Sequence, residues 1–157
     1  MKIQSLNNME VFTISEKASD QIWNEVKDWD YFSKKSMGIQ WIRAVDSIGA
    51  NIAESYGRYH YSEKVNFLYY ARGSVFEAKF WLNRALASGL INEKLGTQIA
   101  TLLSEIAFQL NAFTKSLKNK QMGKTVKSIR EKPARYDNKN QDQIFSEDEL
   151  ESLNSLF

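Results

Sequence analysis

The polar residues with the most regular spacing lie in the run RAVDSIGANIAESYGR, residues 43–58. Arg43, Ser47, Asn51, Glu54 and Arg58 follow one another at steps of four, four, three and four. On a helix this spacing places them along one side as a polar stripe. Carboxylate, amide and guanidinium groups in a row suit three roles: general acid–base catalysis, hydrogen bonding across a subunit interface, or solvation of an exposed face.

A second polar row follows on the next helical segment, and it contains Asn66, Tyr70, Gly73, Glu77 and Arg84. On neighbouring helices, Glu77 is positioned to meet Arg43 or Arg58. We therefore predict that the two rows form a subunit interface or a central channel, in which hydrogen-bonded polar groups fix the register. The residues predicted for assembly are Arg43, Ser47, Asn51, Glu54, Gly73 and Glu77, with the small residues Gly49, Ala50 and Ala53 beside them.

Two alternatives for these rows stay open. One is a solvated face with ion pairs that contribute about 0–1 kcal/mol each. The other is a catalytic site in which Glu54 or Glu77 acts as an acid or base. The catalytic alternative lacks a nucleophile–base pair, and the Glu-x-x-His pairs of a di-iron bundle are absent. We predict a protein that is not an enzyme, with no catalytic residue, metal or cofactor.

The composition supports that prediction. The chain has 157 residues, 43% of them hydrophobic and 25% charged, which is ordinary for one globular domain. It contains no cysteine and a single histidine, His60, so thiol chemistry, zinc ribbons and Ser-His-Asp triads are disfavoured. No apolar run approaches the ~18 residues of a membrane span, and we expect a cytoplasmic protein without membrane contact.

Apolar residues recur at helical spacing through residue 117, and the elements that position the polar rows are therefore expected to be helices. A first helix is expected over residues 13–30, with Thr13 and Glu16 as a capping box. The polar residues 33–38 are interpreted as the connection to the second helix. That helix is expected to end near Gly57 in the left-handed conformation that glycine favours.

Ser62 is a candidate N-cap of a third helix, which Gly89 is expected to close. Asn92 is then expected to cap a fourth helix, whose apolar pattern runs to Leu117. Short connections between four helices favour an all-α, antiparallel, up-down-up-down four-helix bundle. A polar C-terminal extension carrying a short helix is expected to follow it.

The composition changes after Leu117. Residues 115–135 contain eight basic residues and one acidic residue, whereas residues 141–157 contain five acidic residues and no basic one. Ser146 and Glu149 match a capping box ahead of Leu150, Leu153 and Leu156. We predict a four-helix bundle over residues 1–119 and a basic-then-acidic extension over residues 120–157.

The basic run is the feature that points to polyanions. Lysine and arginine on an exposed arm contact phosphates without sequence preference, and their affinity depends on salt. His60, between two tyrosines, is a candidate stacking or phosphate contact, although a loop histidine is usually an ordinary surface residue. The residues predicted to contact RNA or DNA are Arg58, His60, Lys120, Lys124, Lys127, Arg130 and Arg135. The alternative is a solvating tail.

The second and third helical segments resemble a four-helix bundle family first noticed as proteins encoded in intervening sequences of bacterial 23S ribosomal RNA genes. The family pattern reads R-A-x-x-S-I-x-x-N-I-A-E-G-x-x-R, then a Phe-Leu pair, then A-x-G-S-x-x-E. Ser55 stands where the family usually has glycine. The resemblance covers roughly residues 10–118 and rests on Arg43, Ala44, Ser47, Ile48, Asn51, Ile52, Ala53, Glu54, Arg58, Phe67, Leu68, Ala71, Gly73, Ser74 and Glu77.

This resemblance implies a bundle that assembles into a ring, most often a homopentamer, without established enzymatic activity. The chain also looks like a distant relative of the accessory variability proteins of diversity-generating retroelements, which bind nucleic acid and a reverse transcriptase. Our hypothesis is therefore an oligomeric, nucleic-acid-binding accessory protein. The alternative is a structural oligomer or an adaptor whose residues 120–157 grip a partner protein.

Overall fold

The computed structural model of the chain describes residues 6–128 and 143–156, and for residues 122–128 it describes the backbone alone. Helices are the only regular secondary structure among the described residues, which confirms the all-α prediction. The long helices are α1 (Glu10–Val26), α3 (Ile39–Gly57), α4 (Tyr61–Ala87) and α5 (Glu93–Ser128). The shorter elements are η1 (Leu6–Asn8), α2 (Tyr31–Ser33), the π-helix η2 (Lys34–Gly38) and α6 (Glu147–Asn154).

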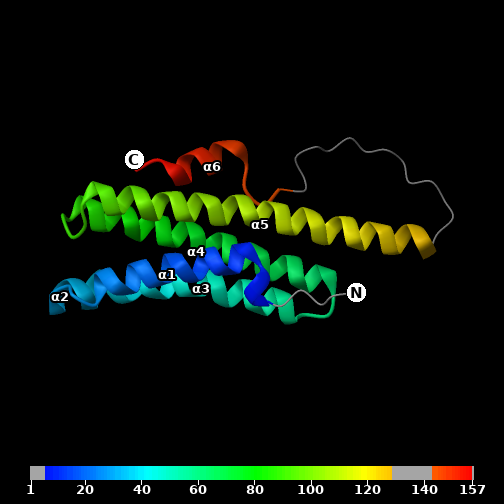
Figure 1. Cartoon of the computed structure of the whole chain (residues 1–157), viewed down its shortest axis with the longest axis horizontal. Coiled ribbons are helices and arrows are strands. Elements are labelled where there is room, and N and C mark those ends of the chain that lie inside the picture. Colours follow the sequence, from blue (N-terminus) through cyan, green and yellow to red (C-terminus); the bar gives the residue numbers. More distant parts are fainter. Residues whose placement is uncertain (1–5, 129–142, 157) are drawn as a thin grey trace.

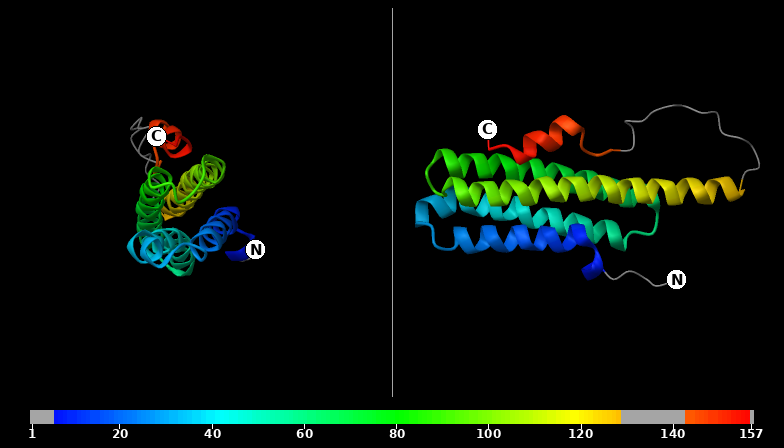
Figure 2. Two further views of the ribbon diagram at one scale, coloured as in Figure 1. Left: turned by 90° about the vertical axis from the view of Figure 1, so that its left-hand side faces the viewer. Right: turned by 45° about the horizontal axis from the view of Figure 1, so that its top comes forward.

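The four long helices lie side by side along the longest dimension of the molecule (Figure 1). α1 contacts α3 and α5, and α4 contacts the same two helices, so the contacts close into a ring seen end-on in Figure 2. α6 packs against α5 on the outside of this ring. α5 extends beyond the ends of the other helices.

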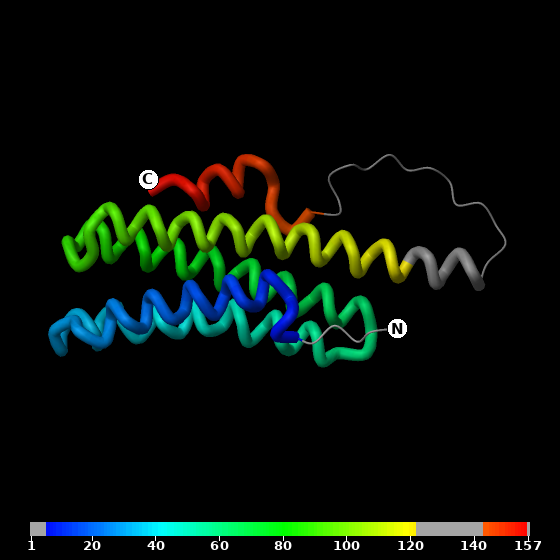
Figure 3. The backbone as a smooth tube through the Cα atoms, in the orientation of Figure 1, coloured from blue at the N-terminus to red at the C-terminus, as the bar shows by residue number. Residues whose placement is uncertain are grey.

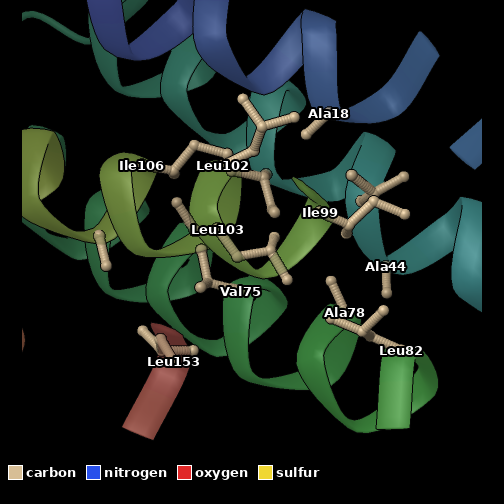
Figure 4. Packing of buried hydrophobic residues seen from close by; sticks show 14 of the residues in the cluster. Ala18, Ala44, Val75, Ala78, Leu82, Ile99, Leu102, Leu103, Ile106 and Leu153 are labelled. Carbon is tan, nitrogen blue, oxygen red and sulfur yellow. The ribbon is translucent and has the colours of Figure 1, made fainter. Parts of the chain in front are cut away.

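The apolar stripes of the four long helices meet in one core. Ala18 and Ala44 line it from α1 and α3, and Leu82 and Ile99 line it from α4 and α5, all at most 2% exposed (Figure 4). Leu153 of α6 joins the same cluster of buried residues from the outside. The helical spacing of apolar residues therefore identified the buried faces, because burial of one face is what holds such helices together.

The predicted connection at residues 33–38 is wrong. The chain is already helical from Tyr31, and α2, η2 and α3 follow one another without a break to Gly57. The connection lies earlier, between α1 and Asp30. Asp30 is the N-cap, and its carboxylate accepts a hydrogen bond from the Ser33 backbone N–H at 3.0 Å. Hydrogen bonds from Ser33, chiefly from its side chain, lower the pKa of Asp30.

Gly38 accounts for the misplaced connection. It lies inside the helical run as a buried residue, and a β-carbon there would fall 2.5 Å from Cγ1 of Val26. The glycine serves close approach between α1 and the following helix, and forms no turn. Trp29 lies on the same contact and stacks on Trp41 with 5.9 Å between ring centroids.

Three of the predicted helix ends also need correction. Thr13 lies inside α1, whose N-cap is Met9 without a side-chain cap, so the Thr13–Glu16 capping box is wrong. Ser62 lies inside α4, whose N-cap is His60. Gly57 does end α3, but among the described residues only Gly89 has a positive φ, 67°.

Three other ends are confirmed. Gly89 follows α4 in the left-handed conformation, and Asn92 accepts a hydrogen bond from the Leu95 N–H at 2.9 Å at the start of α5. Ser146 and Glu149 form the predicted capping box of α6. α5 continues to Ser128, past residue 119 where we predicted the bundle domain to end.

Candidate interaction surfaces

The polar side chains of the α3 stripe form most of their hydrogen bonds and ion pairs with other residues of the stripe. The Ser47 hydroxyl donates to the Arg43 carbonyl at 2.7 Å, and the Asn51 amide donates to the Ser47 carbonyl at 2.8 Å. Glu54 and Arg58 form an ion pair one turn apart. Arg43 and Glu54 are exposed, whereas Ser47 and Asn51 are half-buried. The stripe is thus one continuous polar row, with most of its groups satisfied within α3.

The predicted contact of Glu77 with Arg43 or Arg58 is absent, since neither ion pair occurs among the described residues. Arg58 instead pairs with Glu54 and lies over the Phe67 ring, 4.7 Å from its centroid. Glu77 and Gly73 are both exposed on α4, and a β-carbon at Gly73 would meet nothing within 4 Å. Tyr70 and Phe80 on the same helix are 60% and 54% exposed. α4 therefore presents an open face that combines aromatic and polar groups.

Five of the residues predicted to bind nucleic acid lie in the described part of the chain, in two groups. Arg58 and His60 are exposed at the turn between α3 and α4. Lys120 is exposed on α5, and Lys124 and Lys127 lie farther along that helix. The turn and the C-terminal half of α5 lie at the same end of the molecule (Figure 1). Arg130 and Arg135 lie outside the described residues.

The same turn contains a set of reciprocal hydrogen bonds that sequence reasoning missed. The Ser55 hydroxyl, fully buried, donates to the Lys64 carbonyl at 2.8 Å. The Lys64 ammonium donates in return to the carbonyls of Ser55 and Tyr56, at 3.2 and 2.8 Å. Burial lowers the pKa of Lys64. These bonds join the end of α3 to the start of α4 at the position where the family pattern has glycine.

A second missed feature is a groove of about 580 Å³ between α1 and α3. Gly49, Ala50 and Ala53 are among its lining residues, with Glu16 and Asp20 from α1. From the sequence, Gly49, Ala50 and Ala53 were noted as small residues beside the stripe, but the helix that they face, α1, was not predicted. The full lining is Phe12, Ser15, Glu16, Ser19, Asp20, Val45, Asp46, Gly49, Ala50 and Ala53.

Asp46 joins α1 to α3 at this groove. Its carboxylate accepts hydrogen bonds from the Ser19 hydroxyl and from Trp23 Nε1, the latter at 3.1 and 3.2 Å to its two oxygens. Trp23 nevertheless remains 49% exposed. The groove thus carries acidic groups beside small residues, in contrast to the basic end of the molecule.

The C-terminal segment, defined as residues 143–156, lies against α4 and α5, as the backbone tube of Figure 3 shows. Ile144, Phe145 and Leu153 are buried there, at most 4% exposed. Arg72 of α4 and Asn111 of α5 hold its backbone through hydrogen bonds. Neither residue was singled out from the sequence. The available signal was Asn111 itself, a polar residue inside the apolar pattern of the fourth helix.

Comparison of the chain with models of known protein families gives a match over most of the helical bundle. The family model described as 23S rRNA-intervening sequence protein matches residues 7–112. The chain belongs to this family. The match to the 23S rRNA-intervening sequence family includes every predicted assembly residue as well as Arg58 and His60. Lys120, Lys124 and Lys127 of α5 and the C-terminal segment lie beyond it. No curated protein matches the chain.

The described residues carry no sign of a membrane span or a metal centre. None of their helices has the length and apolar content needed to cross a bilayer. Nor do three or more of their histidine, aspartate and glutamate side chains gather closely enough to hold a metal ion.

Proposed function

We propose that this member of the 23S rRNA-intervening sequence family is an up-down-up-down four-helix bundle with a short C-terminal helix. It acts as a cytoplasmic, non-enzymatic oligomer that binds RNA or DNA as an accessory protein. The supporting observation is the helix α5, which extends beyond the other long helices and bears the first five lysines of the basic run (Figure 2). Nucleic-acid affinity of this type comes mainly from neutralised phosphates and released counterions.

The charge of the α5 extension, defined as residues 113–128, favours such binding. It contains Lys115, Lys118, Lys120, Lys124 and Lys127 and no acidic residue. Lys115 and Lys120 are exposed. Because this end of α5 extends beyond the other described helices, none of them blocks the approach of a nucleic-acid backbone. Arg58 and His60, at the same end, would enlarge this surface.

For assembly, we propose that the stripe of α3 and the open face of α4 pack against neighbouring copies. Exposed aromatic groups such as Tyr70 and Phe80 favour this, since tyrosine and phenylalanine are enriched at interfaces. Gly73 allows close approach. The family resemblance implies a ring of five copies.

Substitutions in the two faces test the assembly. Asn51→Leu or Glu77→Leu should change the oligomer mass measured by light scattering while helicity is retained. An unchanged mass would contradict the proposed interface.

The binding experiment is fluorescence anisotropy with labelled RNA and DNA over a salt series. In the test variant, Lys120, Lys124, Lys127 and Arg130 are replaced by glutamine. In the control variant, Lys17, Lys27, Lys35 and Lys94 are replaced by glutamine, so both lose the same charge. If the basic run carries binding, the test variant loses affinity for nucleic acid, whereas the control changes little. The slope of log affinity against log salt concentration should also fall by about 3–4 in the test variant.

Equal binding by both variants would remove the α5 extension from the proposal. The absence of salt-dependent binding by the wild-type chain would favour the second candidate function, a structural oligomer or protein adaptor. The observation that favours this candidate is the set of exposed aromatics at the other end of the molecule, Tyr31 and Phe32, which are 75% and 77% exposed. Such groups suit a protein partner better than phosphates.

A further inference from the structure

The C-terminal segment is bound as a peptide would be. Asn111, 9% exposed, contacts its backbone with both ends of one carboxamide. Oδ1 accepts from the N–H groups of Ile144 and Phe145, both at 2.7 Å, and Nδ2 donates to the Phe145 carbonyl at 2.8 Å. These bonds satisfy three polar backbone groups of a buried dipeptide, which would otherwise be costly to remove from water.

The side chains of the segment meet a complementary site on α4. Phe145 is fully buried beside Phe76, with 5.4 Å between ring centroids. The Arg72 guanidinium lies over both rings, 4.8 Å from the Phe76 centroid and 5.4 Å from that of Phe145. Arg72 Nε donates to the Ile144 carbonyl at 2.6 Å, and the same group forms an ion pair with Glu149. The site thus recognises an aliphatic–aromatic pair followed by a carboxylate four residues later.

The segment itself has the character of a ligand. α6 has eight residues, fewer than an isolated helix needs for stability in water, so its order depends on docking. Its capping box and the buried Leu153 fix the helix once it is docked. Arg72, Phe76 and Asn111 lie within the family match of residues 7–112, whereas the segment lies outside it. The receiving site therefore lies within the part of the chain that the family model covers, and the ligand lies outside that part.

The chain between α5 and the segment has surplus length. Asn111 contacts the start of the segment, and the helix from Asn111 to Ser128 is about 25 Å long at 1.5 Å per residue. The fourteen residues 129–142 can span up to about 50 Å when extended. This is about twice what a return to the same chain requires, so the length also permits a reach to a neighbouring molecule.

From these observations we propose that the face of α4 and α5 that this segment covers, with Arg72, Phe76 and Asn111 and called the peptide groove below, is a peptide-binding site. Its ligand is the Ile-Phe pair and short acidic helix of the C-terminal segment. The segment detaches as a unit, and the vacated groove binds the same segment of a second copy. Within an isolated molecule the tether gives its own segment a high effective concentration. In an assembly, neighbouring segments compete for each groove and link the copies.

Whole chains with reversed charges test the exchange. In Arg72→Glu and in Glu149→Arg, each groove faces a like charge on its own segment, so the segment is released and cut by protease at Phe145. Mixing the two variants pairs the introduced carboxylate on α4 of one chain with the introduced guanidinium on α6 of the other. It also pairs the unchanged Arg72 of the second chain with the unchanged Glu149 of the first, so both segments are protected when they exchange. We expect cleavage in the mixture to be slower than in either variant alone by about fivefold or more. The double variant Arg72→Glu, Glu149→Arg should be protected without mixing.

Peptide binding provides the second measurement and does not depend on other subunit contacts. The host is the full chain with Phe145→Ala, and the probe is a fluorescent peptide of residues 143–157. Because the wild-type groove is already occupied, we expect the host to bind the probe at least about tenfold more tightly than the wild-type chain does. Adding Asn111→Ala to the host should reverse this gain, and a probe with Phe145→Ala should not bind.

The outcomes separate the two parts of the proposal. A helical host that binds the probe no better than the wild-type chain, or binds it without Asn111, overturns the peptide site. If the host does not fold by circular dichroism, Glu149→Arg takes its place with the same probe. Probe binding without protection in the mixture of reversed variants overturns the exchange between copies.

Discussion

Gly38 and Val26 are in such close contact that a β-carbon at position 38 would lie 2.5 Å from Cγ1 of Val26. No β-carbon tolerates that distance, and both residues are buried, so Gly38→Ala requires the Val26 side chain or the two packed helices to shift. We expect this substitution to lower the free energy of unfolding by about 1–3 kcal/mol. Urea unfolding followed by circular dichroism measures the change.

Gly57→Ala is the matched control for this prediction. Gly57 is also a helical glycine, the last residue of α3, and it has no positive φ, but its added β-carbon meets nothing within 4 Å. Alanine has the higher helix propensity, so Gly57→Ala should leave the stability unchanged or raise it by up to about 1 kcal/mol. A loss of stability at both positions would mean that helix geometry, and not the contact with Val26, makes glycine necessary at position 38.

Gly38 also explains where sequence reasoning failed. Glycine among polar residues predicts a turn, and a close helix–helix contact is equally a use of glycine. The contact partner, Val26, lies twelve residues earlier, and only the folded chain shows that the two meet. In contrast, Asn92 and Ser146 were predicted correctly as N-caps, because a cap depends on residues within one turn of helix.

The candidate interaction surfaces show the same difference between local features, which the sequence predicts, and contacts between distant residues, which it does not. The stripe of α3 follows from spacing alone, since helix geometry fixes which residues share a side. Asn111 was not predicted, because its role is defined by Ile144 and Phe145, more than thirty positions away. Asp46 likewise acts through Trp23 of another helix. A polar residue on an apolar face was the available signal for Asn111, and it does not reveal the partner.

Asp46 should contribute measurably to the contact of α1 with α3. Asp46→Ala removes the acceptor shared by Ser19 and Trp23, and we expect a loss of about 1 kcal/mol in the free energy of unfolding. Asp20→Ala, in the same groove, is the control and should stay within about 0.5 kcal/mol of the wild-type chain. Equal effects of the two substitutions, measured in the same denaturant series, would indicate that groove charge matters and the specific hydrogen bonds do not.

Ser55 should stabilise the turn between α3 and α4 relative to the glycine of the family pattern. Ser55→Gly removes the hydrogen bond to the Lys64 carbonyl and adds a glycine to a helix, so we expect a loss of about 1–2 kcal/mol. Ser55→Ala removes the hydrogen bond but keeps a good helix former, and should fall between the wild-type chain and Ser55→Gly. Thermal unfolding of the three chains gives the order, and an alanine variant as stable as wild type would show that the hydrogen bond contributes little.

Lys79 should make the stability depend on alkaline pH. Burial beside the C-terminal segment lowers the pKa of Lys79 below its ordinary 10.5, and its ammonium donates to the Ser155 carbonyl. Between the lowered pKa and 10.5 the unfolded chain binds more protons than the folded chain, so the Lys79 contribution to the free energy of unfolding rises with pH. Below the lowered pKa both states carry the charge, and the full cost of burying it is present.

Comparison with Lys79→Met isolates this contribution, because other titrating groups are common to both chains. The free energy of unfolding of the wild-type chain minus that of Lys79→Met should increase from about pH 7 to about pH 10, measured by urea unfolding at each pH. Lys79→Gln, which also removes the charge, should give the same trend. A difference that stays constant or decreases with pH would mean that the ammonium is stabilised by its contact with Ser155 at least as well as by water.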